Sequence, residues 1–227
     1  MIVFFDIDDT LIDHSRAMRT AAIRMHADLG MPVKFETFMA DWLEAHRRHY
    51  PRFLAGELSY EALRRLRIRE TVSADLRDED ADDLFATYMK TYRSAWAIFP
   101  DVMPCLDRLR SCTLGVISNG PSVEQREKLR ALEIEDRFQH ILISEECGCA
   151  KPAPQIFRRA CQMVAASPNE VVYVGDHLEI DVCASRDAGL RGIWLNRLGR
   201  ECHTGHFEVV GSLIELSDIL RDRATKA

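Results

Sequence analysis

The chain contains no apolar run long enough to cross a membrane. A membrane-spanning helix needs roughly 18 or more consecutive apolar residues, and every apolar run here is shorter. The apolar start MIVFF leads directly into aspartates and has neither a basic flank nor a small-residue cleavage site, so it is typical of a buried strand rather than a signal sequence. We therefore expect a globular protein of the cytoplasm without a membrane partner.

The chain also lacks an excess of basic residues. It has 30 Lys and Arg against 36 Asp and Glu, which gives a net charge of −6. Nucleic acids and anionic membranes are bound through basic surfaces. Neither is an expected partner, and any site for an anion such as phosphate must be local.

The cysteines form no recognisable metal or redox motif. There is no CxxC pair, the number is odd, and no histidine is spaced with them as in a zinc site. Cys147 and Cys149 flank one glycine, and we expect them to be structural thiols rather than a redox or zinc pair. The seven are Cys105, Cys112, Cys147, Cys149, Cys161, Cys183 and Cys202.

Short apolar runs rich in β-branched residues alternate with helical patterns in the second half of the chain. Such runs, without polar alternation, are typical of parallel strands covered on both faces. The predicted strands are 2–7, 113–118, 140–144, 171–175 and 192–196. Helical stretches at 122–132 and 154–166 lie between them, and each crossover is long enough for a right-handed β-α-β unit. We expect an α/β fold.

Residues 15–96 have a different pattern. This segment is rich in Ala, Leu, Arg and Glu, with apolar residues three and four positions apart, as in FMADWLEAHRRHY. The spacing predicts about four helices. We expect a helical domain at 15–96, inserted into an α/β core made of 1–14 and 97–227, with hinges near 13–15 and 98–101.

Polar residues follow the strands that are predicted to be most buried. DIDDT follows the first strand at 6–10, SNG lies at 118–120, and GD lies at 175–176 with Asp181 beyond it. Ligands of open α/β sheets bind beyond the carboxyl ends of the strands. These residues can therefore converge, and the long side chain of Lys151 can reach the same crevice.

The chemistry of this set indicates phosphoryl transfer. Asp6 and Asp176 offer hard oxygen ligands, which suit Mg²⁺ better than zinc, and Mg²⁺ completes its shell with water and a substrate phosphate. One aspartate can act as a nucleophile, and a carboxylate two residues on can donate a proton and then activate water. The Ser118 hydroxyl, nearby backbone N–H groups and the Lys151 ammonium can hold the phosphoryl oxygens.

Four motifs, in order, resemble those of the haloacid dehalogenase-like hydrolase superfamily. They are DIDDTL at 6–11, SNG at 118–120, KPAP at 151–154 and GDHLEID at 175–181. Each is weak alone, but the four in this order, at strand ends and helix starts, are strong, and the resemblance covers nearly the whole chain. It implies subfamily I of that group: a three-layer, Rossmann-like parallel sheet of order 3-2-1-4-5 with an inserted all-helical type 1 cap.

The resemblance also implies roles for individual residues. Asp6 would be the nucleophile, Asp8 the general acid and base, and Lys151 the stabiliser of charge. Asp8 would in addition offer its backbone carbonyl to the ion, and Asp181 would be an outer or water-mediated partner. The implied metal residues are Asp6, Asp8, Asp176 and Asp181, and the implied phosphate-binding residues are Thr10, Ser118, Asn119 and Gly120.

Some of these residues have simpler interpretations. Asp9 and Asp13 are read as surface or turn residues, and His177 as a loop residue rather than an acid or base. Asp181 alone would be compatible with a charge at a helix start. An isolated Asp-x-Asp also occurs in sugar transferases, so the assignment depends on all four motifs together.

Within the superfamily, the residues favour a phosphatase. Hydrolytic dehalogenases lack an aspartate at the position of Asp8. Phosphonate hydrolysis requires a cap lysine, and neither Lys34 nor Lys90 lies in an evident apolar pocket. Phosphomutases usually have Gly where this chain has Asp9, so a mutase or phosphotransferase ranks lower. A non-catalytic phospho-ligand binding protein would be expected to have lost a motif residue, and none is lost.

The substrate itself stays open. The stretch GELSYEALRRLRIRE resembles a cap segment of pyrimidine 5′-nucleotidases and related small-metabolite phosphatases, with Arg67 at the position of a recurrent arginine. HRRHYPR at 46–52 has basic and aromatic groups, although a solvated helix face explains it equally well. We expect a Mg²⁺-dependent phosphatase, monomeric or homodimeric, that acts on a small phosphorylated metabolite, with the helical segment closing over the crevice to set specificity.

Overall fold

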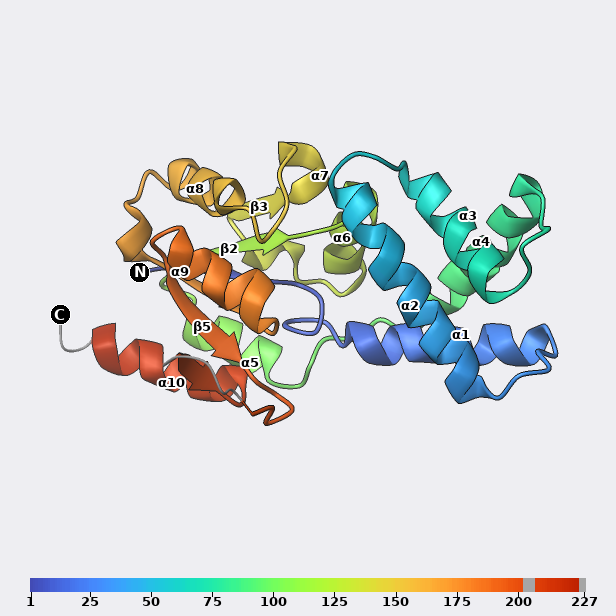
Figure 1. Cartoon of the computed structure of the whole chain (residues 1–227). Helices are drawn as coiled ribbons and strands as arrows, with labels where there is room; N and C mark the ends of the chain where they lie inside the picture. The colour runs from blue at the N-terminus through green and yellow to red at the C-terminus, as the bar shows by residue number, and fades with distance from the viewer. Residues whose placement is uncertain (202–206, 225–227) are drawn as a thin grey trace. The chain divides into compact units, whose positions relative to one another are not determined.

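The computed structural model describes residues 1–201 and 207–224 of the 227-residue chain (Figure 1). It divides into two compact units. The α/β unit comprises Met1–Asp13 and the chain from Ile98 onward, and the helical unit is His14–Ala97. The segment predicted to be helical, 15–96, lies inside the helical unit. Each unit is described separately below.

A six-stranded parallel sheet forms the centre of the α/β unit. Its strands lie in the order β3-β2-β1-β4-β5-β6, with Val3 of β1 paired to Leu114 of β2 on one side and to Val172 of β4 on the other. The bounds are Ile2–Phe5 (β1), Thr113–Ser118 (β2), His140–Ile143 (β3), Val171–Gly175 (β4), Arg191–Leu195 (β5) and Glu208–Val210 (β6). The predicted α/β fold and the order 3-2-1-4-5 are confirmed, and β6 extends the sheet.

Helices cover both faces of this sheet. Because successive side chains of a strand point to opposite faces, Val3 and Phe5 pack on the side of α5 and α10, whereas Phe4 packs on the side of α8 and α9. Figure 1 shows these two helical layers. The helices and short turns are α5 (Val102–Arg108), α6 (Ser122–Ala131), η1 (Glu135–Arg137), α7 (Ser144–Cys147), α8 (Pro154–Met163), η2 (Pro168–Glu170), η3 (Leu178–Cys183), α9 (Ala184–Asp187) and α10 (Leu213–Ala224).

The helical unit contains α1 (His14–Asp28), α2 (Phe35–Leu54), α3 (Tyr60–Thr71) and α4 (Asp78–Ser94). Its core is aromatic: the Trp42 ring lies 4.8 Å from that of Tyr88 and 6.3 Å from that of Phe38, between centroids. None of the described helices in either unit has both the length and the apolar composition of a membrane span.

The cysteines of the described residues are free thiols. The sulfurs of Cys147 and Cys149 lie 3.4 Å apart, and burial raises the pKa of Cys149 to about 11. A thiol with so high a pKa is protonated at neutral pH and is a weak nucleophile. The structural role of this pair stays a prediction, and Cys202 lies outside the described residues.

An ion pair joins the start of α5 to the chain after β5. Two nitrogens of Arg197 lie 2.8 and 2.9 Å from the carboxylate oxygens of Asp101, which also accepts from the Leu213 N–H group at 2.8 Å. The guanidinium lies 3.9 Å from the Phe99 ring centroid. Burial alone would raise the pKa of Asp101, but the hydrogen bonds from Arg197 and Leu213 outweigh it and hold the pKa below its usual value.

We expect Asp101→Asn to lower the free energy of unfolding by about 1–3 kcal/mol at neutral pH. A carboxyl with a lowered pKa stabilises the fold above its unfolded-state pKa of about 3.9, and this contribution is lost as the pH falls through the lower folded-state pKa. Urea unfolding should therefore show that the difference in free energy of unfolding between wild type and variant becomes smaller in acid. Asp107→Asn, on an exposed carboxylate, is the matched control. If the difference in free energy of unfolding did not depend on pH, Asp101 would not be ionised in the folded protein.

Candidate active site

The turn after β1 places Asp6 and Asp8 at the carboxyl edge of the sheet. The Asp6 N–H group still donates to Val174 at 2.9 Å, but the next residues turn, with the N–H groups of Leu11 and Ile12 donating to the Ile7 carbonyl at 2.9 and 3.0 Å. The predicted strand 2–7 therefore ends at Phe5. Asp9 has a left-handed φ of 57°, which Asp tolerates better than most residues.

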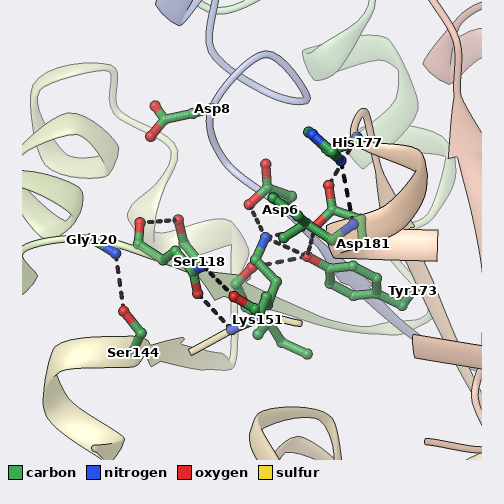
Figure 2. Close-up of polar contacts among 12 residues, drawn as sticks. Asp6, Asp8, Ser118, Gly120, Ser144, Lys151, Tyr173, His177 and Asp181 are labelled. Atoms are coloured by element: carbon green, nitrogen blue, oxygen red, sulfur yellow. Dashed lines mark hydrogen bonds and ion pairs between the residues drawn. The ribbon is translucent and has the colours of Figure 1, made fainter. Parts of the chain in front are cut away.

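Lys151 lies at the centre of a buried polar group. Its Nζ atom is 2.5 Å from Asp6 Oδ1, 2.7 Å from Asp181 Oδ1 and 2.9 Å from the Tyr173 hydroxyl (Figure 2). Lys151 is 4% exposed and Asp6 6%. Burial by itself lowers the pKa of Lys151, but the Asp181 and Asp6 carboxylates outweigh this and raise it, so the ammonium keeps its charge.

Burial acts on the pKa values of Asp6 and Asp176 in the opposite direction from its effect on Lys151, because it disfavours the charged form of each group. The pKa of Asp6 is raised well above its usual value by burial, against the pull of Lys151, and the carboxylates of Asp181 and Asp176 add to the shift. Burial likewise raises the pKa of Asp176 to about 7, with Asp181 and Asp9 contributing repulsion. The ionised forms of Asp6 and Asp176 are therefore disfavoured at this site, and a cation bound between them would lower both pKa values.

A close approach of backbone and side chain holds Asp181 in place. A side-chain carbon at Gly175 would lie 2.4 Å from the Asp181 carboxylate, so only glycine fits there. The other oxygen of Asp181 accepts from the His177 N–H group at 3.0 Å. His177 itself caps the turn η3, with Nδ1 accepting from the Ile180 N–H group at 3.3 Å; that it takes no part as an acid or base stays a prediction.

Three carboxylates fit a divalent cation. Oxygens of Asp6, Asp176 and Asp181 lie within 4.8 Å of one another. Asp181 is bound by Lys151, whereas the Asp176 carboxylate has no hydrogen-bond partner among the residues that the structure describes. Asp176 is only partly buried, so its carboxylate is open to a ligand, and an all-carboxylate donor set suits a hard cation. Asp6 and Asp176 would hold such an ion, with Asp181 behind them.

The SNG motif is tied to the segment of Lys151. The Asn119 amide donates to the Lys151 carbonyl at 2.9 Å and accepts from the Lys151 N–H group at 2.8 Å. The Gly120 N–H group donates to the Ser144 hydroxyl at 3.0 Å, so this predicted phosphate donor has an acceptor within the protein. Ser118 is 1% exposed and lies at the end of β2.

Two predicted binding residues are enclosed. The Thr10 side chain is fully buried, and its hydroxyl has no hydrogen-bond partner within the described parts of the chain. Arg67 belongs to the helical unit, is 8% exposed, and places its guanidinium 4.1 Å from the Trp42 ring centroid. Both stay candidate substrate residues.

A family model described as haloacid dehalogenase-like hydrolase matches residues 1–189. The chain belongs to this family. The glyceraldehyde 3-phosphate phosphatase of Pyrococcus abyssi is 32% identical to this hydrolase over 201 residues, which are 85% of this chain and 80% of that protein. The N-acylneuraminate-9-phosphatase of Homo sapiens is 27% identical, over 96% of this chain and 93% of that protein.

Solved structures of other family members share the fold of this hydrolase. The HAD-hydrolase YfnB of Bacillus subtilis superposes with a TM-score of 0.79 at 22% identity, covering 96% of this chain and 97% of that chain. A 2-haloacid dehalogenase of Pseudomonas syringae gives 0.71 at 28% identity, covering 97% and 98%. The family that the four motifs predict is thereby confirmed.

Sequence reasoning missed several polar residues around the motifs of this hydrolase. Tyr173 lies in the middle of β4 with its hydroxyl 3.1 Å from the Ile117 carbonyl and 3.0 Å from Asp181, and burial raises its pKa well above the usual value, so it stays a donor. Its phenolic hydroxyl, within the otherwise apolar run VVYVG, was the sequence feature that could have indicated a polar contact here. Gln125 and Lys128 of α6 were also missed; both contact Asp8.

Proposed function

We propose that this hydrolase is a Mg²⁺-dependent phosphatase that hydrolyses a small phosphorylated metabolite, a phosphomonoester, through an aspartyl-phosphate on Asp6. Two of the relatives named above, the glyceraldehyde 3-phosphate phosphatase of Pyrococcus abyssi and the N-acylneuraminate-9-phosphatase of Homo sapiens, are named as phosphatases of small phosphorylated metabolites. The cytoplasm as its location, and a monomer or homodimer as its state, stay predictions from the sequence.

The position of Asp6 supports this proposal most directly. Its carboxylate lies at the carboxyl end of β1, at the edge of the sheet where α/β proteins bind ligands. One oxygen contacts Lys151, so the ammonium can neutralise charge as a phosphoryl group arrives. A nucleophilic carboxylate next to a fixed cation suits covalent phosphoryl transfer, because the cation stabilises the charge that develops on the phosphoryl oxygens.

The residues divide the reaction into two steps. Asp6 attacks the phosphorus atom as a carboxylate, while Asp8 enters this step as the carboxylic acid, gives its proton to the leaving oxygen and is left ionised. Asp8 then removes a proton from water, which hydrolyses the acyl-phosphate. Ser118 and Lys151 would hold the phosphoryl oxygens throughout. Mg²⁺, when bound, would add positive charge at those oxygens.

Asp8 separates this function from dehalogenation. A halide leaves without a proton, so a dehalogenase needs no acid at this position, whereas an alkoxide leaving group does. A phosphotransferase or mutase would use the same residues with a different acceptor, and stays the second candidate. Arg67 is our candidate in the helical unit for contacts to the rest of the substrate.

The test is a panel assay of sugar phosphates, nucleotides, phosphorylated acids and an aryl phosphate, with Mg²⁺ and with excess chelator. We expect turnover in Mg²⁺ and none in chelator. A 2-haloacid is assayed alongside. Purified, folded protein that releases phosphate from no panel member with Mg²⁺ present would refute the phosphatase.

Ion binding has a second readout that does not depend on turnover. Because a ligand that binds only the folded state stabilises it, Mg²⁺ at about 100 times its Kd should add about 2.7 kcal/mol to the free energy of unfolding. The melting temperature of wild type should rise with Mg²⁺, and that of Asp176→Asn should rise much less. Equal shifts in both proteins would place the ion elsewhere.

A further inference from the structure

Lys128 is a buried cation that the two-step scheme leaves unused. It lies in α6 and is 1% exposed. Its Nζ atom is 2.8 and 3.1 Å from the two carboxylate oxygens of Asp8, and 3.2 Å from a carboxylate oxygen of Glu124. A buried ammonium costs folding free energy that an apolar side chain of the same size would not. Stability alone therefore does not explain a lysine at this position.

Gln125 approaches the same carboxylate from the same helix. Its amide nitrogen is 2.9 Å from Asp8 Oδ2, 3.1 Å from the Ser118 hydroxyl oxygen and 2.8 Å from the Asn119 carbonyl. An amide nitrogen has two hydrogens, so these three acceptors share them. The direction of the Asp8 carboxylate is thus coupled to the end of β2, where the phosphoryl group is proposed to bind.

The result is a separation of Asp6 and Asp8, the two aspartates of the DIDDTL motif to which we assign catalytic roles. Figure 2 shows the Asp8 carboxylate apart from the group formed by Asp6, Lys151 and Asp181. Lys151 pairs with Asp6, and Lys128 pairs with the ionised form of Asp8, the form that takes a proton from water in the second step. Two carboxylates near one ion would otherwise compete for the same cation or repel one another.

We propose that Lys128 and Gln125 are positioning residues for Asp8, an inference that rests on the phosphatase function proposed above. They direct the Asp8 carboxylate toward the Ser118 side of the site. They also keep it from taking the place of the Asp6 carboxylate beside Lys151 or a bound cation. Neither residue touches substrate. The effect of Lys128 on the reaction passes through Asp8, because Asp8 is the group that transfers the proton, whereas Gln125 also contacts Ser118.

A double-mutant cycle tests this dependence. Steady-state turnover of an aryl phosphate is measured for wild type, Lys128→Met, Asp8→Asn and the double variant. We expect Lys128→Met to lower wild-type turnover by about 10- to 100-fold, because a misdirected acid and base loses much of its contribution. In the Asp8→Asn protein the same change should alter turnover by less than about two-fold, because coupled sites are not additive.

The leaving group provides a second readout. Lys128→Met should reduce turnover of an alkyl phosphate more than first-turnover cleavage of an aryl phosphate, because only the alkoxide needs the proton from Asp8. Arg130→Met, an exposed basic residue on the same helix that pairs with Glu135, is the matched control and should behave as wild type. Gln125→Leu, which introduces no charge, replaces Lys128→Met if the latter does not fold.

The outcomes separate cleanly. Equal losses of turnover on Lys128→Met in the wild-type and Asp8→Asn backgrounds would mean that Lys128 acts independently of Asp8. No loss of turnover in either background would mean that Lys128 does not position Asp8. Either outcome overturns the inference. A wild-type protein without phosphatase activity would instead refute the proposed function, and this is known before any variant is compared.

Discussion

Asp6→Asn protein is expected to lose phosphatase activity by a factor on the order of 10⁴ or more, because removal of a nucleophile leaves only the contribution of binding and charge stabilisation. An amide is a poor nucleophile and a weaker ligand for a cation than a carboxylate. In wild type the Asp6 carboxylate forms an ion pair with the Lys151 ammonium. The neutral Asn side chain would keep the contact but not the ion pair. The measurement is the initial rate of phosphate release from the best panel substrate in Mg²⁺.

Two controls make this loss specific. Asp13→Asn makes the same chemical change in a residue that we read as non-catalytic, and it should keep wild-type turnover. Thermal unfolding of the Asp6 variant shows whether the fold is retained. A folded Asp6→Asn protein that hydrolyses the substrate at a tenth of the wild-type rate or faster would remove Asp6 from the role of nucleophile.

Asp8→Asn is expected to fail at a different step. An aryl phosphate has a good leaving group that needs little protonation, so Asp6 can still attack it. Hydrolysis of the acyl-phosphate should then be slower by roughly 10² to 10⁴, because no base remains to activate water. Rapid mixing with excess aryl phosphate should give a burst of phenolate close to one equivalent, followed by slow turnover.

The control for this burst is the alkyl phosphate. It should give no burst with Asp8→Asn, since its leaving oxygen needs the missing proton. Steady turnover at the wild-type rate, or a burst of equal size with both substrates, would mean that Asp8 is not the acid and base.

The sheet could be predicted from the sequence because its strands are short, apolar and β-branched. The runs 113–118 and 171–175 have the observed bounds of β2 and β4. β6, Glu208–Val210, has three residues and begins with a charge, so it lacks such a signal. The first strand ends earlier than its apolar pattern, because the turn closed on the Ile7 carbonyl is set by backbone hydrogen bonds.

The site could be predicted only as a set of residues. The four motifs predict that Asp6, Lys151, Asp176 and Asp181 belong together, and the structure brings their side chains to one edge of the sheet. The direction of Asp8 depends on a side-chain torsion and on partners 117 and 120 residues away. Gln125 and Lys128 share a helix face at a spacing of three, but that spacing does not reveal which residue they face.

The most direct test of the account is the intact mass of Asp8→Asn protein mixed with excess aryl phosphate in Mg²⁺ and quenched in acid. We predict the added mass of one phosphoryl group, located on Asp6 by peptide mapping, and no added mass for the Asp6→Asn/Asp8→Asn double variant. A phosphoryl group on any other residue, or one that persists when Asp6 is replaced, would contradict the assignment of Asp6 as the nucleophile.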